Sequence, residues 1–290
     1  MHKSFVRFAI IGVLALTLAA CTAVRFGYNQ GPELVYWWLD RYLDFDLEQK
    51  AKARDDIAEW FRWHRRTQLP DYAQLLAKAQ VEVGDAVTPA QICRWSDTVQ
   101  SRVDVAFEHA LPALADSVRA LTPQQIKHME RKYEKNIKEY RKDFLQPDPQ
   151  ERRRMQIERV ADRAEMVYGR LNDAQRERIA QLVAQSPFDP QAWLVERQQR
   201  QQDVLLTLRR LSAEHAGAAD AQLAVKQLYE HTFHSPREPY WRYQQSLLKF
   251  NCDFAAQVHN LSTLHQRDHA MKRFKGWADD VRALSGQELP

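Results

Sequence analysis

Glycine is scarce in this chain of 290 residues, with eight against the roughly twenty that average usage would give. The scarcity argues against nucleotide-binding folds, which hold phosphates in glycine-rich loops. The sequence also contains no Gly-x-Ser-x-Gly segment, the turn that presents the nucleophile of many hydrolases. An excess of one charge is lacking too, because 42 basic residues stand against 38 acidic ones and leave a net charge of +4. A nucleic-acid-binding protein normally carries a larger and clustered basic excess, so we expect no nucleic-acid partner.

Helix starts recur along the chain, while strand signals are nearly absent. Each start is a polar residue followed by proline, or by Glu or Gln three residues later, which satisfies backbone N–H groups that have no partner inside a helix. Seven such starts lie at Asp46, Thr88, Thr122, Asp148, Asn172, Asp189 and Ser235, and a weaker eighth lies at Ser262, with His265 three residues later.

Between the starts, apolar residues recur with the period of a helix. Ile126, Met129, Tyr133, Ile137 and Tyr140 follow one another at steps of three or four among charged residues, which indicates one apolar stripe on a charged rod. We therefore expect an all-α fold over residues 32–290, a bundle or curved array of roughly nine to eleven amphipathic helices. Two packed halves could meet at a turn near 146–150 or 186–190.

The N-terminus has the layout of an export signal. Lys3 and Arg7 precede an apolar stretch that ends in Ala19, Ala20 and Cys21. Leu18 to Cys21 resembles the lipobox of bacterial lipoproteins, which implies removal of residues 1–20 and acylation of Cys21. Residues 21–31 would then form a lipidated tether. The alternative is an uncleaved membrane helix over residues 8–24, a length at the lower limit for crossing a bilayer.

The residue after the lipobox cysteine indicates the destination. Thr22 stands where lipoproteins kept in the inner membrane typically carry aspartate. By that analogy we expect a lipid-anchored protein on the periplasmic face of the outer membrane, with no cofactor apart from the covalent lipid on Cys21.

Two further cysteines, Cys93 and Cys252, would lie in an oxidising compartment. They could form a disulfide that pins helices far apart in sequence, or stay two buried thiols. The sequence leaves both readings open, because it does not give the distance between the two Cα atoms.

His265 and His269 are the candidates for a metal site. Their spacing places both imidazoles on one face of a helix, where they could share a zinc ion. Asp268 stands where zinc peptidases with the corresponding inverted motif carry a glutamate. The sequence pattern indicates no third zinc ligand. His231 and His234 form an equally weak candidate pair. We therefore expect this histidine pair to lie on the exposed face of a helix and to bind no metal.

Residues 32–47 are unusually rich in aromatic side chains and follow closely on the lipobox. Trp37 and Trp38 are adjacent, so their side chains point about 100° apart on a helix. Both rings could pack inside the bundle with Tyr42 and Phe45, or one could contact the membrane or a partner protein.

The mature chain resembles a proteobacterial lipoprotein family described as a domain of unknown function. The resemblance rests on residues 21–29, Tyr36 to Asp40, and Trp63 to Pro70. It implies an all-helical lipoprotein and transfers no catalytic residue. Locally, Leu121 to Gln125 and Leu171 to Gln175 resemble the Leu-Thr-x-x-Gln repeats of the Spy and CpxP periplasmic chaperones, with Asn172 in place of threonine.

These observations favour a non-enzymatic scaffold or chaperone-like protein that binds an envelope protein. The alternatives are a hydrolase acting on peptidoglycan or lipid and a steric foldase for one secreted enzyme. The sequence does not indicate an oligomeric state.

Overall fold

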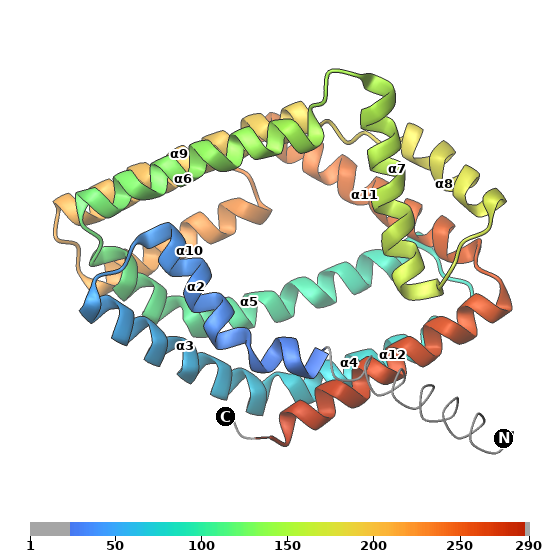
Figure 1. Cartoon of the computed structure of the whole chain (residues 1–290), viewed down its shortest axis with the longest axis horizontal. Coiled ribbons are helices and arrows are strands. Elements are labelled where there is room, and N and C mark those ends of the chain that lie inside the picture. Colours follow the sequence, from blue (N-terminus) through green and yellow to red (C-terminus); the bar gives the residue numbers. More distant parts are fainter. Residues whose placement is uncertain (1–23, 288–290) are drawn as a thin grey trace, which may run out of the picture. The chain divides into compact units, whose positions relative to one another are not determined.

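The computed structural model describes residues 24–287, and every regular element in that part of the chain is a helix (Figure 1). This confirms the all-α prediction. Residues 24–29 form a first helical stretch. The elements that follow are α2 Gly31–Leu43, α3 Leu47–Thr67, α4 Leu69–Glu82, α5 Pro89–Arg119, α6 Pro123–Phe144, α7 Pro149–Tyr168, α8 Asp173–Ala184, α9 Pro190–Ala213, α10 Ala218–Phe233, α11 Glu238–Asn260 and α12 Leu264–Ser285.

The chain divides into two compact units. Unit 1 contains the described residues 24–37, 54–85 and 264–287, and unit 2 contains 38–53 and 86–263. The boundaries pass through α2 and α3, so each of these helices contributes to both units. The expected division near 146–150 or 186–190 is wrong, because both turns lie inside unit 2, where α6 and α9 pack on each other.

Most of the helix starts follow the capping pattern of the sequence. Thr88, Thr122 and Asn172 each accept a hydrogen bond from the backbone N–H three residues later, and the glutamine at that position bonds back. Asp148 and Asp189 each accept from the N–H two residues later, and a proline directly follows each of them. These local bonds fix where five helices of unit 2 begin.

Unit 2 has several small apolar clusters. One joins α7 and α8 with α11, a second joins α5, α9 and α10, and a third joins α6 with α9. Small side chains such as Ala115, Ala161 and Ala221 are fully buried and let the helices approach closely. The stripe of α6 predicted from the sequence is also largely buried, with Ile126, Met129, Ile137 and Tyr140 inside.

Unit 1 is dominated by the packing of α4 against α12. Ala73 of α4 and Ala270 and Ala278 of α12 are buried. Just after α4, a Cβ added to Gly84 would lie 3.3 Å from the sulfur of Met271, which is tighter than an ordinary contact. Gly84 therefore lets the end of α4 lie close to α12, although the two helices are almost 200 residues apart in sequence.

Candidate functional site

Residues 24–31 are held within unit 1 by contacts with α3 and α12. Nε of Arg25 donates a hydrogen bond to the buried carboxylate of Asp280 at 2.8 Å, and Asn29 accepts one from the guanidinium of Arg65 at 2.8 Å. A Cβ at Gly31 would lie 2.6 Å from the ring of Phe61, so glycine is needed for this close approach. The expectation of a tether over residues 21–31 is therefore wrong from residue 24 onward.

Polar side chains buried in unit 1 stabilise this docking. The hydroxyl of Tyr28 lies 2.9 Å from Nδ1 of His64, whose ring stacks on Trp60 at 4.6 Å. Burial raises the pKa of Tyr28 to about 12 and lowers the pKa of His64 to about 4, so both side chains are neutral near pH 7. Buried Arg65 also donates to the carbonyl of Leu284 at 3.3 Å, which links the segment to the end of α12.

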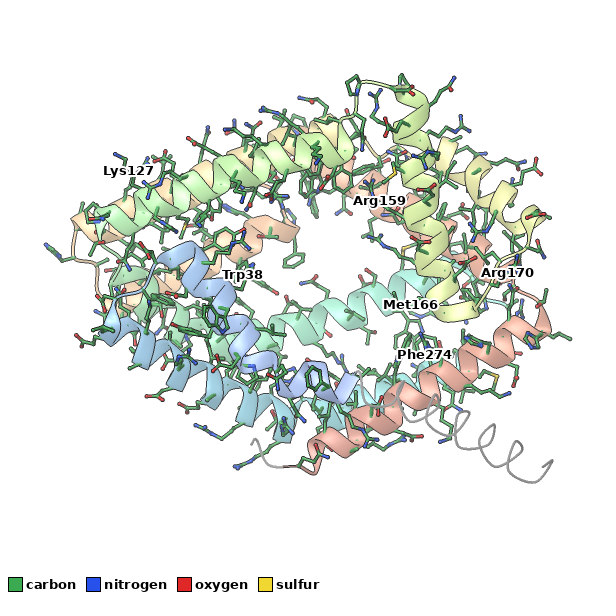
Figure 2. All side chains as sticks on the ribbon, viewed as in Figure 1. Trp38, Lys127, Arg159, Met166, Arg170 and Phe274 are labelled. Carbon is green, nitrogen blue, oxygen red and sulfur yellow. A yellow bond between two sulfur atoms is a disulfide. The ribbon has the colours of Figure 1, made fainter. Side chains whose placement is uncertain are left out.

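The helix that continues from this segment, α2, exposes its largest apolar side chains. Leu34, Trp37 and Trp38 are 61%, 64% and 59% exposed, whereas Tyr36 is only 4% exposed and lies under the guanidinium of Arg54 at 3.7 Å from the ring centre. Figure 2 labels Trp38 on this helix. The interpretation that both tryptophans pack inside the bundle is wrong, because the aromatic residues buried here are Tyr36 and Phe45.

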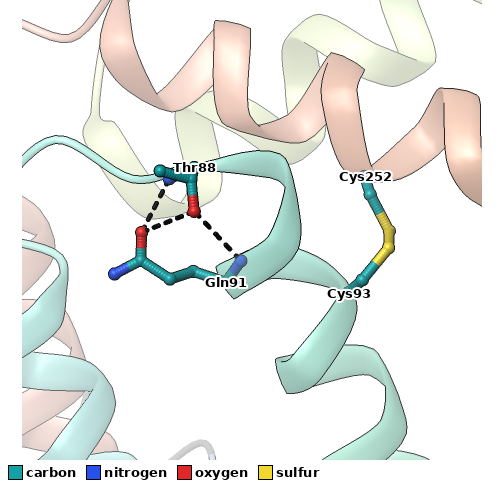
Figure 3. Close-up of a disulfide and its surroundings, with 4 residues drawn as sticks. All are labelled: Thr88, Gln91, Cys93 and Cys252. Atoms are coloured by element: carbon teal, nitrogen blue, oxygen red, sulfur yellow. Dashed lines mark hydrogen bonds between the residues drawn. A yellow bond between two sulfur atoms is a disulfide. The ribbon is translucent and has the colours of Figure 1, made fainter.

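In unit 2, α5 and α11 are joined by a disulfide between Cys93 and Cys252 (Figure 3). The S–S distance is 2.01 Å and the Cα atoms are 5.4 Å apart, within the range for disulfides. Nearby, Asn260 accepts from the N–H of Val87 at 3.0 Å and donates to its carbonyl at 2.9 Å. The sequence left open whether these cysteines form a disulfide or stay two buried thiols. The structure contains the disulfide, which joins residues 159 positions apart in the sequence.

A buried carboxylate at Glu196 forms a second linkage in unit 2, which the sequence analysis missed. Glu196 accepts from Nε of Arg237 at 2.7 Å and from Nε of Arg200 at 3.0 Å. Ser235, expected to cap a helix, donates its hydroxyl to Glu196 at 2.8 Å and accepts from the N–H of Arg237 at 3.2 Å, but α11 begins only at Glu238, with Arg237 as its cap residue. Arg237 also donates to Asp203 at 2.9 Å.

The electrostatics of this cluster indicate a structural role. Burial raises the pKa of Glu196, but hydrogen bonds from Arg237, Ser235 and Arg200 outweigh it, and the net pKa is lowered. Hydrogen bonding to Glu196 raises the pKa of Arg237. The pair therefore stays charged, and no periodic or motif signal marks Glu196 in the sequence because its partners come from separate segments.

The histidine pair lies on the surface of α12. His265 and His269 are both exposed, and between them Asp268 pairs with Lys272 at 2.7 Å. The Lys272 hydrogen bond lowers the pKa of Asp268 despite a small opposing effect of burial. Over residues 24–287, no three His, Cys, Asp or Glu side chains come together in an arrangement that could hold a metal ion.

A cavity of about 10 Å³ in unit 2 is lined by Tyr168, Leu171, Gln175, Ile179, Val258, Leu261 and Ser262. This volume is about the space that one water molecule needs, so the cavity is too small for a substrate. Ser246 and Lys249 of α11 have the Ser-x-x-Lys spacing of some hydrolases, but both are exposed on the helix surface.

The lipobox and the proposed acylation site Cys21 lie outside the described residues. Within residues 24–287, no helix combines the length and apolar character needed to cross a bilayer. Comparison with curated proteins and with solved structures gives no match. A family of unknown function (DUF6279) matches residues 41–231, which is more than half of the chain. The chain therefore belongs to this family of unknown function.

Proposed function

We propose that this chain is a proteobacterial lipoprotein, held by acyl chains on Cys21 at the periplasmic face of the outer membrane. The observation that carries the proposal is the Cys93–Cys252 disulfide, because such bridges persist in oxidising compartments and are rare in the cytosol. It agrees with the export signal at residues 1–20 and the lipobox cysteine that follows it.

In this compartment the protein acts as a non-enzymatic helical scaffold that binds an unfolded or partly folded envelope protein. In unit 2, α5 exposes Val99 and Val103, which lie one turn apart on the same side of the helix. Apolar side chains on an amphipathic helix are a common means of holding apolar segments of a partner. No cofactor is required for such a role.

Mass spectrometry of the protein from the native membrane tests the anchor. We expect a chain that begins at Cys21 and carries acyl groups. A chain that still begins at Met1 and carries no acyl group would overturn the proposed location.

A light-scattering assay tests the binding role. The probe is a β-barrel outer-membrane protein diluted from urea, and we expect the chain to reduce its aggregation. Val99→Ser combined with Val103→Ser should remove the effect, whereas Val81→Ser, at an exposed position of α4 in unit 1, should preserve it. Unchanged scattering of the probe with the wild-type chain would overturn the role.

A further inference from the structure

The exposed face of α2 is the most aromatic surface that the described residues leave uncovered. Leu34, Trp37 and Trp38 occupy positions i, i+3 and i+4 and therefore share one side of the helix. We call Leu34, Trp37 and Trp38 the aromatic face. Large exposed apolar side chains grouped in this way mark an interaction surface.

The position of the aromatic face in the chain indicates what covers it. Val24 is helical and lies three residues after Cys21. Three extended residues span at most about 11 Å, so an acylated Cys21 would hold the start of the helical stretch within that distance of the lipid. Whatever the path of residues 22 and 23, the connection is too short to lift this part of unit 1 away from the bilayer.

The connection is also stiff on the protein side. Arg25 and Asn29 are held by Asp280 and Arg65 at 2.8 Å, and Tyr28 lies against His64. These contacts start four residues after Cys21. An acyl anchor would therefore hold unit 1 close to the membrane, whereas a long flexible linker would let it move away.

The chemistry of the aromatic face suits the headgroup region of a bilayer. Tryptophan is enriched at membrane interfaces because its ring is apolar while its N–H needs a polar partner. The acidic side chains of α2 are paired, Glu33 with Arg54 and Asp40 with Lys50. Arg41, exposed one turn after Trp37, adds a positive charge that attracts acidic headgroups.

We propose that the aromatic face inserts into the headgroup region of the membrane that carries the acyl anchor, so that α2 lies directly on the bilayer. This rests on the acylation of Cys21 proposed above. The aromatic face then serves as a second membrane contact beside the acyl anchor.

Lipid quenching of tryptophan fluorescence tests this contact. The full-length precursor is produced in a bacterium and processed there, and the product is reconstituted in vesicles of phosphatidylethanolamine and phosphatidylglycerol with brominated acyl chains. The chain has eight tryptophans, and we expect Trp37→Phe with Trp38→Phe to remove most of the bromine-dependent quenching. The matched control Trp193→Phe should preserve it, because Trp193 stacks on Tyr140 inside unit 2 at 4.5 Å.

A second variant leaves all tryptophans in place. Leu34→Ser should weaken the quenching, while Leu223→Ser, an equally exposed leucine on α10, should not. Because Leu34, Trp37 and Trp38 are exposed, these changes leave no cavity, and thermal unfolding should be unchanged.

Mass spectrometry of the same samples separates this proposal from the proposed anchor. If Cys21 is acylated and quenching does not depend on Trp37, Trp38 or Leu34, the membrane contact is overturned while the anchor stands. If Trp37→Ser instead abolishes a dimer or a crosslink to a protein and leaves quenching unchanged, the occupant is a second copy or a protein partner, which also overturns it. An unacylated product in the bacterial membrane would overturn both.

Discussion

Unit 1 and unit 2 are both all-helical, but their long-range links differ in kind. Unit 2 has a covalent bridge between α5 and α11 and a buried ion cluster around Glu196. Unit 1 has no disulfide among its described residues and is assembled from three segments of the chain, including parts near both ends. Unit 1 therefore depends on apolar and polar packing that forms only when its distant segments meet, which costs more chain entropy than local contacts do.

Among the changes that test this difference between the two units, removal of α12 should have the largest effect. A chain ending at Thr263 lacks the main packing partner of α4 and also Asp280, the partner of Arg25. We expect residues 24–37 and 54–85 to lose protection from hydrogen exchange, because their buried surface becomes exposed, while residues 86–263 keep theirs. Leu264→Ser, at an exposed position of α12, serves as the control and should leave protection unchanged. Loss of protection throughout unit 2 would show that the two units do not fold separately.

Glu196→Ala should destabilise unit 2 by about 1.5–3 kcal/mol, because it removes a buried carboxylate that accepts hydrogen bonds from Arg237 and Arg200. Urea unfolding followed by hydrogen exchange in residues 86–263 measures the change. The matched control is Glu130→Ala, whose partner Arg209 forms an exposed ion pair at 2.8 Å and should contribute less than about 1 kcal/mol. Equal losses in the two variants would contradict a structural role for the cluster.

Cys93→Ser should lower the stability of unit 2 by about 2–4 kcal/mol, since the bridge restricts the unfolded chain over 159 residues. Reductant should have the same effect on the wild-type chain and no further effect on the variant. Unfolding midpoints in urea with and without dithiothreitol measure both effects. A wild-type midpoint that is insensitive to reductant would show that the bridge contributes little to the difference between the units.

Mild acid should affect unit 1 through His64. The pKa of His64 is lowered by burial from 6.5 to about 4, so below pH 6.5 the unfolded chain takes up a proton that the folded chain does not. Stability should therefore be highest above pH 6.5 and fall as the pH drops toward 4, with a slope of at most about 1.4 kcal/mol per pH unit from this group.

His64→Phe keeps an aromatic ring at this position and should remove that part of the slope, as measured by hydrogen exchange of residues 54–85 between pH 7 and 4. The control His265→Phe replaces an exposed histidine and should keep the slope. An unchanged slope in His64→Phe would show that the acid sensitivity of unit 1 has another source.

Local features of the fold were predictable because they depend on neighbouring residues. Thr88, Thr122 and Asn172 begin helices as expected, since a side-chain cap and the glutamine three residues later interact wherever they occur. Ser235 shows the limit of this reasoning. Its hydroxyl accepts from the N–H of Arg237 and donates to the carboxylate of Glu196, 39 residues away, but α11 begins three residues later, at Glu238.

The candidate site was predictable only in part. The aromatic density of residues 32–47 pointed to α2, but periodicity alone did not indicate which rings are buried. Tyr36 is covered because Arg54 stacks on it, whereas Trp37 and Trp38, on the same helix, remain exposed. Likewise, the docking of Arg25 on Asp280 joins residues 255 positions apart, which no local pattern records.

The sequence by itself determined the helical class and most helix starts, because each depends on a short stretch of neighbouring residues. Tertiary structure decided the division into two units, the pairing of Cys93 with Cys252, the burial of Glu196 and the outward orientation of the aromatic face. These features depend on which distant segments meet. That outcome is set by the sum of many packing contacts, each individually weak, and not by any one motif.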